Sequence, residues 1–509
     1  MADNPHQVGF FVGDILAGTA RRYPEKVALI SRDEELTYAQ VNEKVTALAK
    51  HLAKEGVKQG ERVGLLLPNS TAFALSYYAT QRMGAVSVVL DARLKGKELA
   101  GVLQDADLSL LITHRRLLPD IGEALKEFSG LPLWVVDGEG QRNFEERAAP
   151  TPDSFVPPKL RPDDDTLILY TSGTTGEPKG VVLNHINLAQ FPRCMTEMCR
   201  TGAEEILGMI LPMSHISGPI LLNEIIDKGG TMVIFDQMNP VTLLEEIQKQ
   251  RITVFHGVPI IFQLLLGVPN LKDYDTSSVK LAAMMGTTVP PPLMRAFKMA
   301  RPHIKVIQGY GLTESSPLIT LTEPQDADAK MASIGKTVPG VEIKIVDESG
   351  KEVPEGEPGE IITRGPHVMK GYFRRPEVTA ERVRGGWLYT GDIGRRDGDG
   401  YYYHLGRKDD MIITGGLNVY PAEVENILCD HPQVGEAVVF PIPDPKRGNA
   451  IGAAVVLKPG EKITEKALLG FLRSNLANFK VPQKIKIRES LPRTSTGKII
   501  RDASMLLSN

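Results

Sequence analysis

The sequence comprises 509 residues, of which 42% are hydrophobic and 24% are charged, and its formal net charge is -3 at pH 7. This length exceeds what one hydrophobic core normally supports, so we expect two or more domains. The balanced charge, with no basic stripe, argues against a nucleic-acid-binding protein. Three scattered cysteines are too few for a disulfide framework or a metal cage and are typical of a reducing compartment.

The N-terminal residues lack the basic region and the long apolar core of a signal peptide. No apolar stretch approaches the ~20 residues that a transmembrane helix requires. We therefore predict a cytoplasmic protein without a transmembrane segment. A homodimer is expected only from the general frequency of such assemblies.

Helical and strand patterns alternate through the first two thirds of the chain. Apolar residues in 38–55 follow one helical face, whereas 63–67 is a continuous apolar run typical of a buried parallel strand. Asn69 and Ser70 can cap the helix that comes next. Such repeated alternation predicts an α/β fold with largely parallel sheets. Further expected elements are a helix at 11–23, strands at 27–31, 85–90, 108–113, 133–136, 209–211, 231–235, 254–255 and 305–308, and a surface connection at 141–162.

The pattern changes after Gly335, where short alternating runs and turn residues predict antiparallel strands. After Gly406 a compact α+β unit is expected. It combines a helix beginning at Pro421, strands at 437–440 and 452–457, and a helix at 464–476. We place the boundary between Lys408 and Asp409, which gives domains 1–408 and 409–509.

The most distinctive stretch is 170–180, Tyr-Thr-Ser-Gly-Thr-Thr-Gly-Glu-Pro-Lys-Gly, between two apolar runs. Glycines let backbone amides face an anion, hydroxyls donate further hydrogen bonds, and a lysine adds positive charge. The stretch therefore predicts a polyphosphate-binding loop, although its spacing is not that of a P-loop. The candidate ligands are Thr171, Ser172, Gly173, Thr174, Thr175, Gly176 and Lys179.

A second motif, Gln-Gly-Tyr-Gly-Leu-Thr-Glu-Ser, occupies 308–315. Gly309 and Gly311 let the backbone approach a ligand closely, and the Tyr310 ring offers a face to a flat base. Thr313 can donate a hydrogen bond to phosphate. Glu314 supplies the hard oxygen that Mg²⁺ prefers.

Four more motifs follow in chain order. They are Trp-Leu-Tyr-Thr-Gly-Asp-Ile-Gly (387–394), Gly-Arg-Lys-Asp-Asp (406–410), Gly-Gly-Leu-Asn-Val-Tyr-Pro (415–421) and Pro-Arg-Thr-Ser-Thr-Gly-Lys (492–498). Together the six motifs resemble the adenylate-forming superfamily, which includes acyl-CoA synthetases. The resemblance implies a large N-terminal domain of doubly wound sheets with a small β-barrel subdomain, and a small mobile α+β C-terminal domain. It also implies an AMP-forming acid–thiol ligase that uses ATP, Mg²⁺ and coenzyme A.

By this resemblance, Tyr310 stacks on adenine, Thr313 contacts the α-phosphate, and Glu314 binds magnesium. Asp392 accepts hydrogen bonds from the ribose hydroxyls, a task that suits its two oxygens. Arg407 contacts ribose or phosphate.

The resemblance also assigns roles to the C-terminal part. Asp409 is the hinge of the small domain, and the loop with Gly415 and Gly416 enters for thioester formation, with Gly416 at the pantetheine tunnel. Lys498 is the catalytic lysine, whose ammonium group holds the substrate carboxylate against the α-phosphate.

Three stretches resemble the walls of the family's acyl pocket: 211–218, 256–259 and 284–289. Amino-acid-activating relatives carry an aspartate near the first stretch, so its His-Ile-Ser-Gly run indicates a plain carboxylic acid. Met285 replaces a glycine of the relatives, and it either reshapes the pocket or belongs to the core. The candidate pocket residues are His215, Ile216, Gly218, His256, Met285, Gly286 and Thr287.

No pocket arginine or lysine suggests a second substrate carboxylate, so we expect an aliphatic or aryl monocarboxylate. Three alternatives share the nucleotide motifs. They are a stand-alone adenylation enzyme that loads a carrier protein, a luciferase-like oxygenase, and a nucleotide-binding regulatory or scaffold protein that has lost catalysis.

Overall fold

The computed structural model describes residues 11–508, except 141–142, 151–154, 173–177, 288, 415–416, 446 and 494–498. A first seven-stranded sheet has the order β19-β8-β7-β4-β3-β5-β6, in which β8 is antiparallel to both β7 and β19 and the other neighbours are parallel. Its strands are β3 (Arg62–Leu66), β4 (Val86–Val89), β5 (Leu110–His114), β6 (Leu133–Val136), β7 (Asp165–Ser172), β8 (Pro178–Asn184) and β19 (Gly371–Tyr372).

A second seven-stranded sheet has the order β13-β12-β11-β9-β10-β1-β2, and only β1 and β2 are antiparallel. Its strands are β1 (Val27–Ile30), β2 (Glu35–Thr37), β9 (Ile206–Met209), β10 (Thr231–Ile234), β11 (Val254–Gly257), β12 (Leu281–Met284) and β13 (Lys305–Ile307). The two sheets confirm the predicted α/β architecture with mostly parallel strands.

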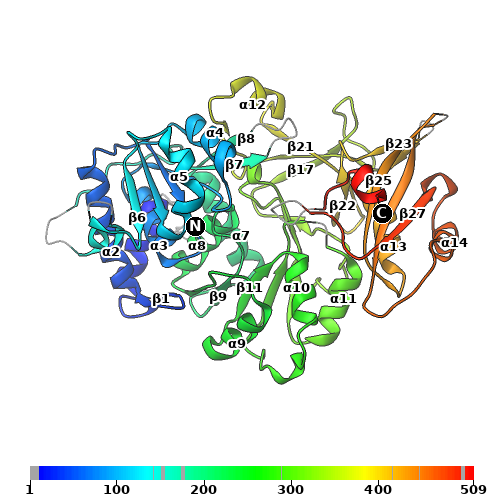
Figure 1. Ribbon diagram of the computed structural model, residues 1–509, viewed down its shortest axis with the longest axis horizontal. Coiled ribbons are helices and arrows are strands. Elements are labelled where there is room, and N and C mark those ends of the chain that lie inside the picture. Colours follow the sequence, from blue (N-terminus) through cyan, green and yellow to red (C-terminus); the bar gives the residue numbers. More distant parts are fainter. Residues whose placement is uncertain are drawn as a thin grey trace, which may run out of the picture.

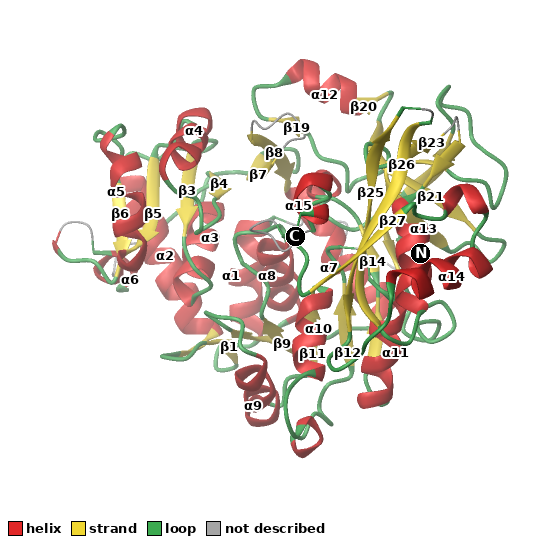
Figure 2. Ribbon diagram, turned by 45° about the vertical axis from the view of Figure 1, so that its right-hand side comes forward, coloured by secondary structure: helices red, strands yellow, loops and turns green. Residues whose placement is uncertain are grey.

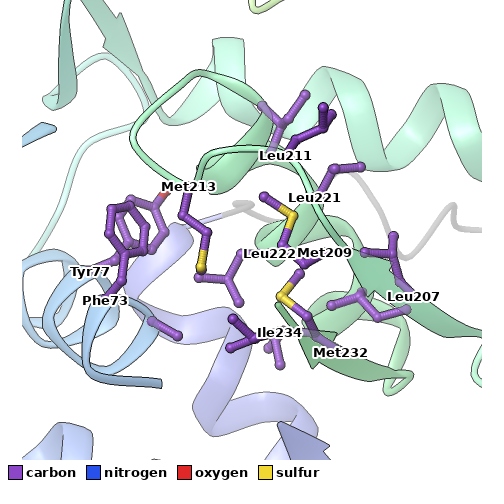
Figure 3. Packing of buried hydrophobic residues seen from close by; sticks show 14 of the residues in the cluster. Phe73, Tyr77, Leu207, Met209, Leu211, Met213, Leu221, Leu222, Met232 and Ile234 are labelled. Atoms are coloured by element: carbon purple, nitrogen blue, oxygen red, sulfur yellow. The ribbon is translucent and has the colours of Figure 1, made fainter. Parts of the chain in front are cut away.

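Helices contact one another beside these sheets, and their buried side chains join strands of both sheets in one large core. Figure 3 shows part of this core, in which Phe73 and Tyr77 lie near Met213 and Leu222. These core helices are α1 (Val12–Arg22), α2 (Tyr38–Lys54), α3 (Thr71–Arg82), α7 (His185–Cys199) and α8 (Ser217–Lys228). As predicted, Ser70 caps α3, because its Oγ accepts a hydrogen bond from the backbone nitrogen of Phe73 at 3.3 Å.

Two further groups of helices complete the layers. The helices α4 (Gly96–Ala106) and α5 (Leu118–Lys126) pack on the first sheet in a separate core. On the second sheet lie α9 (Pro240–Gln250), α10 (Pro259–Leu266) and α11 (Pro291–Ala300), the green helices at the bottom of Figure 1. The predicted surface connection contains a short helix, α6 (Phe144–Ala148), with a buried phenylalanine at its start.

An antiparallel unit follows the second sheet, where the small barrel subdomain was predicted, and its five strands form a sheet. Its strand order is β17-β18-β21-β20, with β22 also on β21. These strands are β17 (Glu342–Val346), β18 (Gly359–Arg364), β20 (Val383–Arg384), β21 (Trp387–Arg396) and β22 (Tyr402–Arg407), with α12 (Pro376–Arg382) before β20. A small sheet of β14 (Gly309–Tyr310), β15 (Thr320–Leu321) and β16 (Lys336–Thr337) precedes them.

The C-terminal unit has its own core, drawn from residues 412–485, and a smaller cluster drawn from 438–506. It occupies the right-hand side of Figure 1, and Figure 2 shows its long strands β25 and β26 beside each other. Its α13 contacts α11 and β22 of the larger part. Its elements are β23 (Ile412–Thr414), β24 (Leu417–Val419), α13 (Pro421–Asp430), β25 (Val434–Asp444), β26 (Gly448–Leu457), α14 (Glu465–Asn475), β27 (Lys484–Arg488) and α15 (Ala503–Leu507).

One predicted strand is displaced. The strand expected at 209–211 is β9, which ends at Met209, and the next residues form a loop held by Asn69. Among the described residues, no helix combines the length and the apolar character needed to cross a bilayer.

Candidate active site

The predicted phosphate loop connects β7 to β8, which pair antiparallel with Thr171 opposite Lys179. The Thr171 hydroxyl donates a hydrogen bond to the Lys179 carbonyl at 3.4 Å. Gly173, Thr174, Thr175 and Gly176 lie outside the described residues, as does the side chain of Ser172. The two described ends of the loop are therefore held by strand pairing, as the flanking apolar runs predicted.

Lys179 and Glu314 meet through an aromatic side chain that the sequence did not single out. The Lys179 ammonium nitrogen lies 5.9 Å from the centre of the Tyr372 ring, and the Tyr372 hydroxyl donates to Glu314 Oε1 at 2.8 Å. Burial, together with the Glu314 charge, raises the pKa of Tyr372, so the hydroxyl keeps its proton. Pairing of β19 with β8 sets Tyr372 opposite Val181 and so brings these three side chains together.

A second cluster surrounds the Asp392 carboxylate, which is 2% exposed. Tyr310 donates its hydroxyl to Asp392 Oδ2 at 2.6 Å, and Arg407 Nη1 donates to Oδ1 at 3.0 Å. His404 Nε2 lies 3.5 Å from the same Oδ1, and its ring centre is 5.8 Å from that of Tyr310. Asp392 and Arg407 are direct partners in the β21–β22 pairing, which explains their contact. Sequence reasoning missed His404.

The electrostatics of this cluster keep Asp392 ionised. Burial alone would raise the pKa of Asp392, but hydrogen bonds and charge from His404, Arg407 and Tyr310 outweigh burial and lower it. Burial, and then the Asp392 charge, raise the pKa of Tyr310 well above its ordinary value. Tyr310 is therefore a protonated donor to a charged acceptor, a strong type of hydrogen bond.

Arg382 joins the two clusters. Its Nη2 donates to the Thr390 carbonyl at 2.6 Å, and its positive charge opposes the rise in the pKa of Tyr372, which lies on the neighbouring β19. Arg407 Nη1 approaches the same Thr390 carbonyl at 3.4 Å. The structure thus brings Lys179, Glu314, Tyr310, Asp392 and Arg407 into two neighbouring clusters with Arg382 between them, and we call these clusters together the network. No local sequence pattern marks Arg382 for this role.

Two glycines are required by the packing of the motifs. A Cβ at Gly311 would lie 1.3 Å from the Pro317 carbonyl oxygen, so no side chain fits there. At Gly391, φ is +70°, and a Cβ would lie 3.1 Å from Arg382 Nη1. The close approach at Gly311 comes just before Thr313 and Glu314, which lie in the short 3-10 helix η5 (Thr313–Ser315).

The first predicted pocket wall is a loop anchored by Asn69. Its amide nitrogen donates to the carbonyls of Leu211 at 2.9 Å and Phe235 at 3.0 Å, and its Oδ1 accepts from Met213 at 2.6 Å. A Cβ at Gly218 would lie 2.1 Å from the Met213 carbonyl oxygen, which excludes any side chain. His215 lies within this loop, and Ile216 packs against the core beside it.

The other two predicted walls lie on neighbouring strands of the second sheet. His256 on β11 is 1% exposed, and burial lowers its pKa to about 4. Met285 follows β12 and packs partly against the core, with its Cε 3.3 Å from where a Cβ at Gly309 would be. Gly286 has a φ of +91°, and Thr287 is exposed. Met285 thus contacts both the core and the backbone that leads to Tyr310.

Three predicted residues, Gly415, Gly416 and Lys498, lie outside the described residues. Asp409 is exposed in the turn between β22 and β23. Before it, the backbone nitrogen of Lys408 donates to the Gly391 carbonyl at 2.8 Å, and Lys408 Nζ donates to Glu360 at 3.1 Å. After it, Asp410 lies 3.6 Å from Arg501 of the C-terminal unit.

The fold, together with this network of a buried carboxylate, tyrosines and cations, defines an enzyme of the nucleotide-activating, adenylate-forming class. Comparison with known proteins agrees. The family model for AMP-binding enzymes matches residues 16–373, and the model for the AMP-binding enzyme C-terminal domain matches residues 423–498. The chain therefore belongs to the AMP-binding enzyme family.

Individual relatives span nearly the whole chain. A feruloyl-CoA synthase from Amycolatopsis sp is 37% identical over 95% of this chain and 96% of its own. A long-chain-fatty-acid–CoA ligase from Bacillus subtilis (strain 168) is 35% identical over 98% of this chain and 95% of its own. The solved structure of an anthranilate CoA ligase in complex with anthranoyl-AMP is 29% identical in sequence, with a TM-score of 0.89. The match covers 97% of this chain and 96% of the ligase. The protein is an AMP-forming ligase that converts a carboxylic acid to its CoA thioester through an acyl-AMP intermediate, using ATP and CoA.

Proposed function

We propose that the network is the nucleotide site of this ligase. In this assignment Tyr310, Asp392 and Arg407 hold the adenosine, and the 171–179 loop together with Thr313 holds the phosphates. Asp392 Oδ2 accepts one hydrogen bond, from Tyr310, and keeps a second lone pair for a ribose hydroxyl, whereas Arg407 and His404 both lie against Oδ1. The observation that carries the proposal is that the contacts of Lys179, Tyr372 and Glu314 lie beside those of Tyr310, Asp392 and Arg407, with Arg382 between them.

Mg²⁺ fits the same site as a companion of the phosphates. The carboxylate of Glu314 is a hard oxygen ligand, and the Tyr372 hydroxyl fixes the orientation of its Oε1. When bound, the metal would neutralise charge on the phosphate oxygens. Glu314 is the residue that we assign to it.

The first half-reaction forms acyl-AMP. The substrate carboxylate attacks the α-phosphorus of ATP, and pyrophosphate leaves. Catalysis consists of positioning and electrostatic stabilisation, because phosphoryl chemistry of this kind needs little covalent help from the protein. We assign the positioning of the carboxylate to Lys498.

The second half-reaction forms the thioester. The CoA thiolate attacks the acyl carbon of acyl-AMP, and AMP leaves. We propose that the unit 409–509 rotates about Asp409 between the steps, which withdraws Lys498 and brings Gly416 with its neighbour Gly415 forward. Two contacts support this proposal. Lys408 is hydrogen-bonded to residues of the N-terminal part, and Asp410 forms an ion pair with Arg501 of the C-terminal unit, so Asp409 lies between a residue held by each part.

The acid is proposed to be an aliphatic or aryl monocarboxylate. The relatives are named for feruloyl, long-chain fatty acyl and anthranoyl groups. We assign the acyl pocket to the loop with His215, Ile216 and Gly218 and to the two strand ends described above. A cytoplasmic location and a homodimer complete the proposal.

The proposal is tested by measuring pyrophosphate release with ATP across acids of graded length and aromaticity, with CoA or with a phosphopantetheinylated carrier protein as acceptor. We expect product formation with CoA and none with the carrier protein. Acyl transfer to the carrier protein alone would contradict the choice of acceptor.

Tyr372→Phe removes only the hydroxyl that holds Glu314. One hydrogen bond to a charged group contributes about 1.5–3 kcal/mol, so we expect kcat to fall by roughly 10- to 100-fold. The Mg²⁺ concentration for half-maximal rate should rise, because Glu314 loses its fixed orientation. Titration of Mg²⁺ against rate checks both effects, and an unchanged Mg²⁺ requirement would contradict the assignment of Glu314. Tyr403→Phe, which removes a hydroxyl bonded to Asp397 outside the network, serves as the control.

A further inference from the structure

Two buried polar atoms lie unpaired on the face of the second sheet that carries the proposed acyl pocket. His256 is 1% exposed and Glu224 is 2% exposed. Among the described residues, neither His256 Nε2 nor Glu224 Oε2 has a hydrogen-bond partner. A buried polar atom without a partner costs stability, and such atoms in native proteins call for an explanation, often a ligand or a water molecule.

The orientation of His256 follows from strand alternation. Its neighbour Phe255 stacks on Phe262 of α10, with ring centres 5.5 Å apart. His256 therefore points to the opposite face, toward α7, where its ring centre is 6.4 Å from that of Phe191.

Strand pairing places His256 directly below the acyl wall. In the parallel register His256 lies beside Ala283, and Ala283 lies beside Ile307. Met285 and Gly309 come two residues later in the chain, just past the ends of β12 and β13, and their near contact was described above. Two residues of strand span about 7 Å, so His256 lies that far below the level at which Gly309 leads into Tyr310.

Glu224 approaches from α8. Its Oε1 accepts hydrogen bonds from Thr201 at 3.1 Å and from Lys228 at 2.9 Å, which leaves only Oε2 unpaired. Its negative charge acts on His256 and opposes the effect of burial, which lowers the imidazole pKa. The imidazole stays neutral at physiological pH, because burial dominates.

Resting on the proposed function, we propose that His256, with Glu224 behind it, forms a polar end to the acyl pocket that binds the hydroxyl group of a hydroxyaryl acid. A hydroxyl can accept from an imidazole N–H and donate to a carboxylate oxygen, which are the two kinds of atom left unpaired. The rest of the wall is apolar, formed by Phe191, Ala283, Ile307 and Met285, and this suits an aromatic ring. His256 is a specificity-determining residue, and Lys498 and the nucleotide site do not depend on it.

The test compares 4-hydroxycinnamate with cinnamate, by CoA-dependent pyrophosphate release, in the wild-type protein and in His256→Phe. A site built to bond a hydroxyl discriminates strongly against the analogue that lacks it. We expect the wild type to prefer 4-hydroxycinnamate in kcat/KM by at least about 10-fold. His256→Phe should lower the ratio of kcat/KM for 4-hydroxycinnamate to kcat/KM for cinnamate by roughly 10- to 100-fold.

Two further variants serve as controls. His367 is another buried histidine with an unpaired nitrogen, so His367→Phe is a matched control that should keep the wild-type preference. His256→Gln retains a hydrogen-bond donor and should restore part of the preference.

Equal kcat/KM for the two acids in the wild type, or a preference that survives in His256→Phe, would overturn the proposal and leave a water molecule as the partner of His256. Octanoate and benzoate are included in the same assay. If neither they nor the two cinnamates release pyrophosphate, the proposed function fails as well, whereas turnover without hydroxyl preference refutes only the role of His256.

Discussion

Lys498→Ala should lower the rate of acyl-AMP formation by at least about 10²-fold and leave thioester formation from supplied acyl-AMP near the wild-type rate. The ammonium group is assigned to holding the substrate carboxylate and offsetting charge on the phosphate oxygens, and both tasks belong to the first half-reaction only. The first step is measured as exchange of pyrophosphate into ATP, and the second as CoA-dependent release of AMP from acyl-AMP.

Lys480→Ala is the matched control for Lys498→Ala. Lys480 belongs to the same C-terminal unit and pairs with Glu423 at 2.6 Å, away from the network. It should leave both half-reactions unchanged. Loss of both half-reactions to the same extent in Lys498→Ala would contradict the role that we assign to Lys498.

Asp392→Ala should lower kcat/KM for ATP by on the order of 10²-fold, because hydrogen bonding from the ribose to a charged acceptor is lost. The free energy of unfolding should fall by about 2 kcal/mol, since the Tyr310 hydroxyl loses its acceptor. The Arg407 side chain is 36% exposed, so water can solvate the guanidinium and limit that cost. Steady-state kinetics with varied ATP and urea denaturation measure the two effects.

Asp397→Ala is the control for Asp392→Ala. Asp397 is another carboxylate of the same subdomain, bonded to Lys330 and Tyr403 instead of the network. It should lose stability and keep its kcat/KM for ATP. An unchanged kcat/KM in Asp392→Ala would refute the assignment of the ribose site.

The pH dependence of stability in Asp392→Asn tests whether Asp392 is ionised, because asparagine keeps the shape of the side chain and removes its charge. The pKa of Asp392 lies below its ordinary value of 3.8 in the folded protein, so ionised Asp392 stabilises the fold above the pKa of the unfolded chain. This contribution is lost as the pH falls through the lower, folded-state pKa. The stability difference between the wild type and Asp392→Asn should therefore be constant near neutral pH and shrink below about pH 4. A difference that persists unchanged at pH 3 would contradict the ionised state.

Most of the fold was predictable because its elements have local signatures. The apolar run before Asn69 predicted β3, and the capping pattern at Ser70 predicted the start of α3. The displaced β9 shows the limit of this reasoning, since Leu211 is apolar but leaves the sheet. Its carbonyl is held by Asn69, a residue 142 positions earlier, and a local pattern carries no such information.

The motif residues of the candidate site could be recognised in the sequence, but the contacts among them could not. Tyr310, Glu314 and Asp392 stand in recognisable strings, whereas Tyr372 and Arg382 do not. Tyr372 bonds to Glu314 across 58 positions of sequence, and Tyr310 bonds to Asp392 across 82. Whether an isolated tyrosine or arginine is a surface residue or part of a site depends on which strands pair. That pairing is a long-range event.

By itself, the amino-acid sequence determined the class of fold and the ends of the loop at 170–180, because apolar periodicity and glycine spacing act over a few neighbouring residues. The resemblance of its motifs indicated the family. Only the tertiary structure decided that Tyr372 and Arg382 connect the two motif clusters, and that His256 faces the acyl wall with an unpaired nitrogen. Those contacts depend on strand register and on helices packed from distant parts of the chain, and register decides which face each side chain takes.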